Sequence, residues 1–219
     1  MNTPQKFAWM LLDGDHESAW DLIQRQMDNG AGTVQIFEDL ITEAMRYVGV
    51  LWENNEVTVA DEHLATSTCD YLLTKYQYYV RERIPHENSR KKAMFLCVQD
   101  EDHFIGLKLV HILFEENGWE TKFMGPNLPL EYALSAAKKW QPEVIGLSFS
   151  LSYRASVLKN YIEEFEGLES APSVLLGGRL LATSDFRKYG SEKTCFVPSL
   201  TQLVDWFDLV RSGGERIVK

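Results

Sequence analysis

The sequence predicts a two-part α/β protein, with an N-terminal bundle of four helices followed by a sheet of five parallel strands. In the first part, apolar residues recur at helical spacing without a strand-like run between them. In the second part, short runs rich in Val, Ile, Leu and Phe alternate with amphipathic helical patterns, which is typical of strands joined by crossover helices. The 219 residues, 45% of them hydrophobic, suffice for two cores.

Four helices with short polar connections are expected in the first part. Their predicted N-caps are Thr3, Thr33 and Thr58, with Pro4 at the first helical position of the first helix. The helices are expected over residues 4–12, 16–28, 33–52 and 58–83. Short connections between helices of this length predict antiparallel neighbours in a bundle.

A polar segment that contains Pro85 separates the helical part from the alternating part. We predict a bundle over residues 1–85, a linker over residues 86–92 and an α/β domain over residues 93–219. Strands are expected over residues 93–99, 120–124, 143–149, 173–177 and 194–197. Helices are expected over residues 104–117, 130–139, 153–166, 179–188 and 199–211. This alternation predicts a doubly wound sheet with the flavodoxin-like strand order.

Composition excludes several classes of function. The formal net charge is −10, and no helix collects Lys and Arg on one face, so we expect no direct binding of nucleic acid. Three cysteines without paired spacing indicate free thiols in a reducing, cytoplasmic protein. The sequence contains neither a signal-peptide pattern nor 18 consecutive apolar residues, so we expect no membrane association.

The chain has no recognisable catalytic constellation. No nucleophile stands with a base and an orienting group at a known spacing, and no Gly-rich loop has a phosphate-binding fingerprint. His16, His86 and His111 have no sequence neighbours that suggest a metal site, and we expect them on the surface or on a helix face. The chain is therefore expected not to be an enzyme.

His103 lies in an acidic loop between a predicted strand and a predicted helix. Open α/β sheets bind ligands beyond the carboxyl ends of their strands, where this loop lies. Glu101 precedes the histidine by two residues and can take the proton of one ring nitrogen, which leaves the other nitrogen for a metal. Gly106 follows three residues after the histidine.

Two further motifs end two other predicted strands. They are Ser148-Phe149-Ser150 and Gly177-Gly178. Serines are small and donate hydrogen bonds, and glycines allow a ligand to approach the backbone closely. Each motif alone fits an ordinary strand end or turn, but the three together predict one ligand site.

The three motifs resemble the cobalamin-binding signature of the methionine synthase and methylmalonyl-CoA mutase type. That signature reads Asp/Glu-x-His-x-x-Gly, then Ser-x-Leu/Thr/Ser, then Gly-Gly, and the resemblance covers roughly residues 91–219. It implies a flavodoxin-like (Rossmann-like) cobalamin-binding domain in which histidine replaces the nucleotide base below cobalt, the base-off/His-on form. The implied cofactor-binding residues are Glu101, His103, Gly106, Ser148, Ser150, Gly177 and Gly178, with His103 as the metal ligand.

The helical part carries a second pattern: Trp52, nine residues, then Glu62-His63, with Val59 between them. From the residues alone, Trp52 also fits core packing, and the Glu-His pair also fits charge at a helix N-terminus. The pattern resembles the helical cap of light-sensing cobalamin repressors of the CarH type. The resemblance implies adenosylcobalamin as cofactor, these four residues around its adenosyl group, and loss of that group in green light as the signal.

The chain departs from those repressors in two respects. It begins at the bundle, where the repressors have a DNA-binding domain, so we expect the output to pass through homo-oligomerisation or a separate regulatory or effector protein in transcription regulation. Glu53 stands where the photoreceptors have the histidine that becomes the second cobalt ligand. After light has removed the adenosyl group, His63 or water is therefore expected as the second cobalt ligand, on the upper face of the cofactor.

Three functions remain open on the sequence. The first is the photosensor, and the second is a corrinoid methyl-carrier subunit of a methyltransferase system, with methylcobalamin. The third is an antirepressor that reports the supply of cofactor without light. A large Trp beside a polar pair suits an adenosyl group better than a methyl group, so the residues favour a sensor over a carrier.

Overall fold

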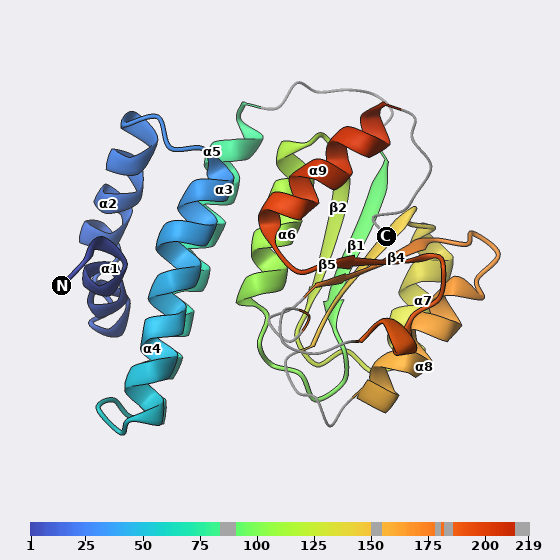
Figure 1. Ribbon diagram of the computed structural model, residues 1–219, viewed down its shortest axis with the longest axis horizontal. Coiled ribbons are helices and arrows are strands. Elements are labelled where there is room, and N and C mark those ends of the chain that lie inside the picture. The colour runs from blue at the N-terminus through green and yellow to red at the C-terminus, as the bar shows by residue number, and fades with distance from the viewer. Residues whose placement is uncertain (84–90, 150–154, 178–180, 182–185, 213–219) are drawn as a thin grey trace. The chain divides into compact units, whose positions relative to one another are not determined.

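The computed structural model describes residues 1–83, 91–149, 155–177, 181 and 186–212. It divides into two compact units, Met1–Arg83 and Ile84–Lys219, and each is described by itself (Figure 1). Most of the predicted linker lies outside the described residues, and the predicted domain bounds stay predictions.

The N-terminal unit is the predicted helical bundle. The third helix is continuous but contains one π-helical turn, in which hydrogen bonds skip one residue more than in an α-helix. Helix α1 packs against both α4 and α5. The elements are α1 Thr3–Leu12, α2 His16–Asp28, α3 Thr33–Gln35, the π-helical turn η1 Ile36–Thr42, α4 Glu43–Glu53 and α5 Val59–Arg81.

Two of the three predicted helix caps were wrong. Asn2 caps α1, because its side chain accepts the Gln5 backbone N–H while the Gln5 side chain accepts that of Asn2, at 3.0 and 3.1 Å. Gly32 precedes α3 without a side-chain cap, and the Thr33 hydroxyl instead lies 2.9 Å from the hydroxyl of Tyr76. The Thr58 cap is confirmed.

The second unit contains the predicted parallel sheet. The strands are β1 Lys92–Cys97, β2 Glu120–Gly125, β3 Val144–Ser148, β4 Ser173–Gly177 and β5 Thr194–Val197. Their order is β2-β1-β3-β4-β5 and all neighbours are parallel, which confirms the predicted flavodoxin-like topology. The helices are α6 Ile105–Glu116, α7 Leu130–Trp140, α8 Ala155–Glu166 and α9 Leu200–Arg211, with a short 3₁₀ turn η4 Arg187–Tyr189.

Helices cover both faces of this sheet. Figure 1 shows α6 and α9 on one face and α7 and α8 on the other. Alternate residues of β1 divide between the two cores: Met94 and Leu96 belong to the core that contains α7 and α8, while Phe95 contacts Phe114 of α6. Most of the predicted helix over residues 179–188 lies outside the described residues. Within the described parts of the chain, no helix is both long enough and apolar enough to cross a membrane.

Candidate functional site

The sheet brings the strands of the three predicted motifs together at one edge. Cys97 at the end of β1 pairs with Ser148 at the end of β3, and Ser148 pairs with Gly177 at the end of β4. The loop that contains His103 follows β1 at this same edge. Ser150 and Gly178 lie outside the described residues, so their predicted roles stay predictions.

A buried carboxylate holds His103 by two hydrogen bonds. Glu101 Oε1 accepts the His103 Nδ1–H at 2.6 Å and the His103 backbone N–H at 2.9 Å. The Glu101 side chain is 1% exposed, whereas that of His103 is 72% exposed. Because Nδ1 keeps its proton and donates a hydrogen bond to the carboxylate, the lone pair of the neutral ring lies on Nε2, the nitrogen that can bind a metal.

Cys97 lies next to this loop but does not offer a thiolate. Its thiol donates to the His103 carbonyl oxygen at a sulfur–oxygen distance of 3.8 Å. Burial, together with the smaller effects of the negative charges of Glu101 and Asp102, raises the pKa of the Cys97 thiol to about 12. At neutral pH the sulfur therefore stays protonated, and Cys97 does not offer a thiolate ligand to a metal at this end of β1.

Two glycines of the predicted motifs leave room that the fold does not use. Among the described residues, a Cβ added to Gly106 would meet no atom within 4 Å, and one added to Gly177 would meet only the Val197 carbonyl oxygen, at 3.8 Å. Neither glycine has the left-handed backbone that would explain its identity. Packing therefore does not require these glycines, and the open space fits the close approach of a bulky ligand.

Trp52 is not a core residue of the bundle. It lies near the end of α4 and is 47% exposed, which excludes the core-packing interpretation. Beside it lies a hollow of about 480 Å³. The residues that line this hollow are Trp52, Glu53, Asn55, Val57, Thr58 and Val59. Two of the four predicted cap residues thus share one concave surface.

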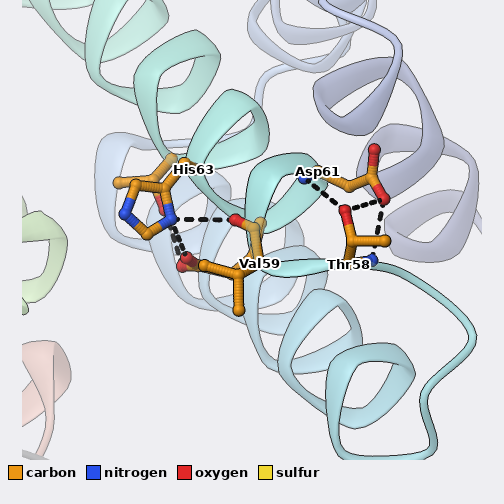
Figure 2. A network of polar contacts seen from close by, with 6 residues as sticks. Thr58, Val59, Asp61 and His63 are labelled. Carbon is orange, nitrogen blue, oxygen red and sulfur yellow. Dashed lines mark hydrogen bonds and ion pairs between the residues drawn. The ribbon is translucent and has the colours of Figure 1, made fainter.

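The other two predicted cap residues, Glu62 and His63, lie in the first turns of α5, and Figure 2 shows His63 there. His63 Nδ1–H donates to the Val59 carbonyl oxygen at 2.9 Å, and the same nitrogen lies 3.1 Å from Glu62 Oε2. The second Glu62 oxygen accepts the hydroxyl of Thr66 at 3.0 Å. The His63 side chain is 73% exposed, with the lone pair of its neutral ring on Nε2.

A capping box fixes the start of α5 and therefore this cap region (Figure 2). Thr58 Oγ1 accepts the Asp61 backbone N–H at 3.3 Å, and the Asp61 carboxylate accepts both the hydroxyl and the backbone N–H of Thr58 at 2.7 Å. These hydrogen bonds lower the pKa of Asp61.

We expect Thr58→Ala to destabilise the bundle by about 1 kcal/mol, while Thr58→Ser stays close to wild type, because serine also caps. Thermal unfolding of both variants measures this. The lowered pKa of Asp61 means that its contribution is present above the unfolded pKa of about 3.9 and is lost as the pH falls through the folded pKa. If the stability difference between Thr58→Ala and wild type does not become smaller in acid, the role of the Asp61 carboxylate is contradicted.

His111 lies on a face of helix α6, which is one of the two predicted positions, but this face is buried. His111 is 4% exposed and lies beside the rings of Phe95 and Phe123, with centroids 5.6 and 5.2 Å away. Its Nε2 lies 2.8 Å from Thr121 Oγ1 and 3.3 Å from Glu115 Oε1. The spacing of four residues between His111 and Glu115 on one helix was the available sequence signal.

Comparison with known proteins identifies both units. Each matches a protein-family model described as B12 binding domain, over residues 5–75 and 91–195. A search of curated proteins gives no match. Among solved structures, the chain is similar to the monomethylamine corrinoid protein of Methanosarcina barkeri, with a TM-score of 0.68 and 17% identity, over 91% of this chain and 94% of that one.

Two further solved structures give a TM-score of 0.49. One is a cobalamin-binding protein from Desulfitobacterium hafniense DCB-2, with 19% identity over 97% of this chain and 98% of that one. The other is the methanol:cobalamin methyltransferase complex MtaBC from Methanosarcina barkeri, with 15% identity over 96% of this chain and 80% of that one.

The chain therefore carries two cobalamin-binding domains, a helical one and a Rossmann-like one. The predicted fold and the predicted corrinoid cofactor are confirmed at this level. The role of each site residue stays a prediction.

Proposed function

We propose that the protein is a photosensor that binds adenosylcobalamin in the base-off/His-on form and signals the loss of its adenosyl group in green light. The observation that carries this proposal is the half-exposed Trp52 beside a hollow, at the spacing from Glu62 and His63 that resembles the caps of light-sensing repressors. A methyl group would need only a small apolar roof, without this large and partly polar surface.

The Rossmann-like domain supplies the lower ligand in this proposal. When bound, adenosylcobalamin supplies a cobalt–carbon bond that green light breaks. His103 binds cobalt through Nε2 while Glu101 holds Nδ1–H, and this pairing fixes the ring and strengthens the ligand. The cofactor takes the space beside Gly106 and Gly177, where the described residues leave room for it.

The bundle supplies the sensing surface. Trp52 offers an apolar face to the adenosyl group, and Glu62 and His63 offer hydrogen-bond partners for its ribose and adenine. Loss of the group leaves Trp52 exposed, and the bundle then changes its packing, its homo-oligomeric state or its affinity for a separate effector protein in the cytoplasm. The chain acts by binding and does not catalyse a reaction of its own.

The test compares the absorption spectrum and elution volume of protein loaded in the dark, before and after green light. We expect adenosylcobalamin-loaded protein to change both, and methylcobalamin-loaded protein to keep its elution volume. Stable binding of adenosylcobalamin without any change in assembly or partner binding after light would contradict the photosensor.

The alternative is a corrinoid methyl carrier with methylcobalamin. The similarity in fold to the monomethylamine corrinoid protein is compatible with this function. A carrier is expected to bind methylcobalamin at least as tightly as adenosylcobalamin. Its elution volume is expected to stay unchanged after green light. A sensor of cofactor supply would change its assembly on binding adenosylcobalamin in the dark, which the same elution profiles detect.

A further inference from the structure

The loop that holds His103 is itself held by the connection between β2 and α7. Asn127 in that connection accepts the Asp100 backbone N–H through Oδ1 at 2.7 Å, and its own backbone N–H donates to the Glu101 carbonyl oxygen at 3.0 Å. Two consecutive residues of the histidine loop are thus bound to one asparagine. One of them is the glutamate whose carboxylate orients the imidazole.

The backbone at this contact adopts a conformation that is rare outside glycine. Asp100 and Asn127 both have left-handed backbone, with φ of 61° and 53°. Such residues persist where the surrounding structure fixes them, and they cluster at functional sites. Here the two left-handed residues are hydrogen-bonded to each other across the two connections.

Tyr161 of α8 adds a second attachment to the same loop. Its hydroxyl accepts the Gln99 backbone N–H at 3.1 Å and donates to the Leu128 carbonyl oxygen at 2.6 Å. The ring is 2% exposed, so the hydroxyl is held from within the core. The backbone of Gln99, Asp100 and Glu101 is therefore hydrogen-bonded at three successive positions, by Asn127 of one other connection and by Tyr161 of one helix.

We propose that Asn127 and Tyr161 are positioning residues for the lower cobalt ligand, which act on the ring of His103 through the backbone of residues 99–101 and the side chain of Glu101. This inference rests on the proposed role of His103. The physical reason is preorganisation: a loop already fixed before the cofactor arrives loses less entropy when the imidazole binds cobalt.

The experiment is a double-mutant cycle on cobalamin affinity in the 219-residue chain. Asn127→Gly keeps the left-handed backbone and its N–H but deletes Oδ1, and Asn127→Asp is the matched control that keeps an acceptor oxygen. We expect Asn127→Gly to weaken binding roughly threefold to tenfold, the value of one hydrogen bond, only where His103 is present. In a His103→Ala background the same substitution is expected to have no effect.

Three readouts, which are thermal unfolding, cobalamin affinity and the absorption spectrum, decide between positioning and a structural role. Thermal unfolding of the cofactor-free variants shows whether the fold survives. A second double-mutant cycle on cobalamin affinity, with Tyr161→Phe in place of Asn127→Gly, tests the hydrogen bond to Gln99. The absorption spectrum shows whether His103 binds cobalt. Suppose that His103→Ala changes the spectrum, as the ligand assignment requires. The inference is then overturned if Asn127→Gly weakens cobalamin binding equally with and without His103, or weakens it in neither case. If His103→Ala leaves the spectrum unchanged, the ligand assignment fails and this inference fails with it.

Discussion

Replacing His103 with alanine is expected to convert the absorption spectrum of the cobalamin-loaded protein from a His-ligated to a base-off form. The Nε2 lone pair of the ring that Glu101 orients disappears with the side chain. We expect affinity to fall by at least the roughly 10- to 100-fold that loss of an outer-shell partner costs at metal sites. Absorption spectroscopy and calorimetric titration measure the two effects.

Folding is expected to survive this substitution, because the side chain of His103 is largely exposed in a loop. His16→Ala is the matched control, since His16 is also exposed but lies at the start of α2. If His103→Ala binds cobalamin with an unchanged spectrum, His103 is not the lower ligand.

Replacing Trp52 with alanine is expected to weaken the binding of adenosylcobalamin more than that of methylcobalamin. Stacking of an aromatic side chain on a base is worth about 1–3 kcal/mol, so the loss should be roughly 5- to 150-fold for the adenosyl form. The methyl form lacks the adenine and should lose little. Parallel titrations with the two cofactors measure the difference.

Trp9→Ala is the matched control for this experiment. Trp9 is also a partly exposed tryptophan of the bundle, but it belongs to α1 and does not line the hollow beside Trp52. Equal weakening of both cofactors by Trp52→Ala would argue for a general structural role and would favour the methyl carrier.

The regular features of the fold were predictable from local sequence. Each described strand begins and ends within about two residues of its expected range, because apolar runs bounded by turn residues report strands directly. The strand order followed from the alternation of strands and helices. The pairing of Glu101 with His103 was also predictable, since the two residues lie only two positions apart.

Contacts between distant segments were not predictable in this way. Asn127 meets Asp100 across 27 positions and Tyr161 meets Gln99 across 62, and neither pair leaves a periodic signal. The burial of His111 depends on Phe95 and Phe123, which belong to two different strands. The predicted Thr3 cap was wrong for a local reason, because Asn2 and Gln5 form a capping box one residue earlier.

The π-helical turn η1 preserves the angular direction of Trp52 around its helix although the turn contains one residue more than an α-helix would need. In an α-helix one added residue rotates everything beyond it by about 100°. A π-helical turn absorbs one such residue locally, so α4 continues with its side chains in their original azimuth. Loss of one residue within Ile36–Thr42 would therefore restore an ordinary helix without turning the indole. Loss of one residue between Glu43 and Trp52 would instead rotate the indole away from the hollow. The position of Trp52 therefore tolerates a one-residue deletion within η1 but not within α4.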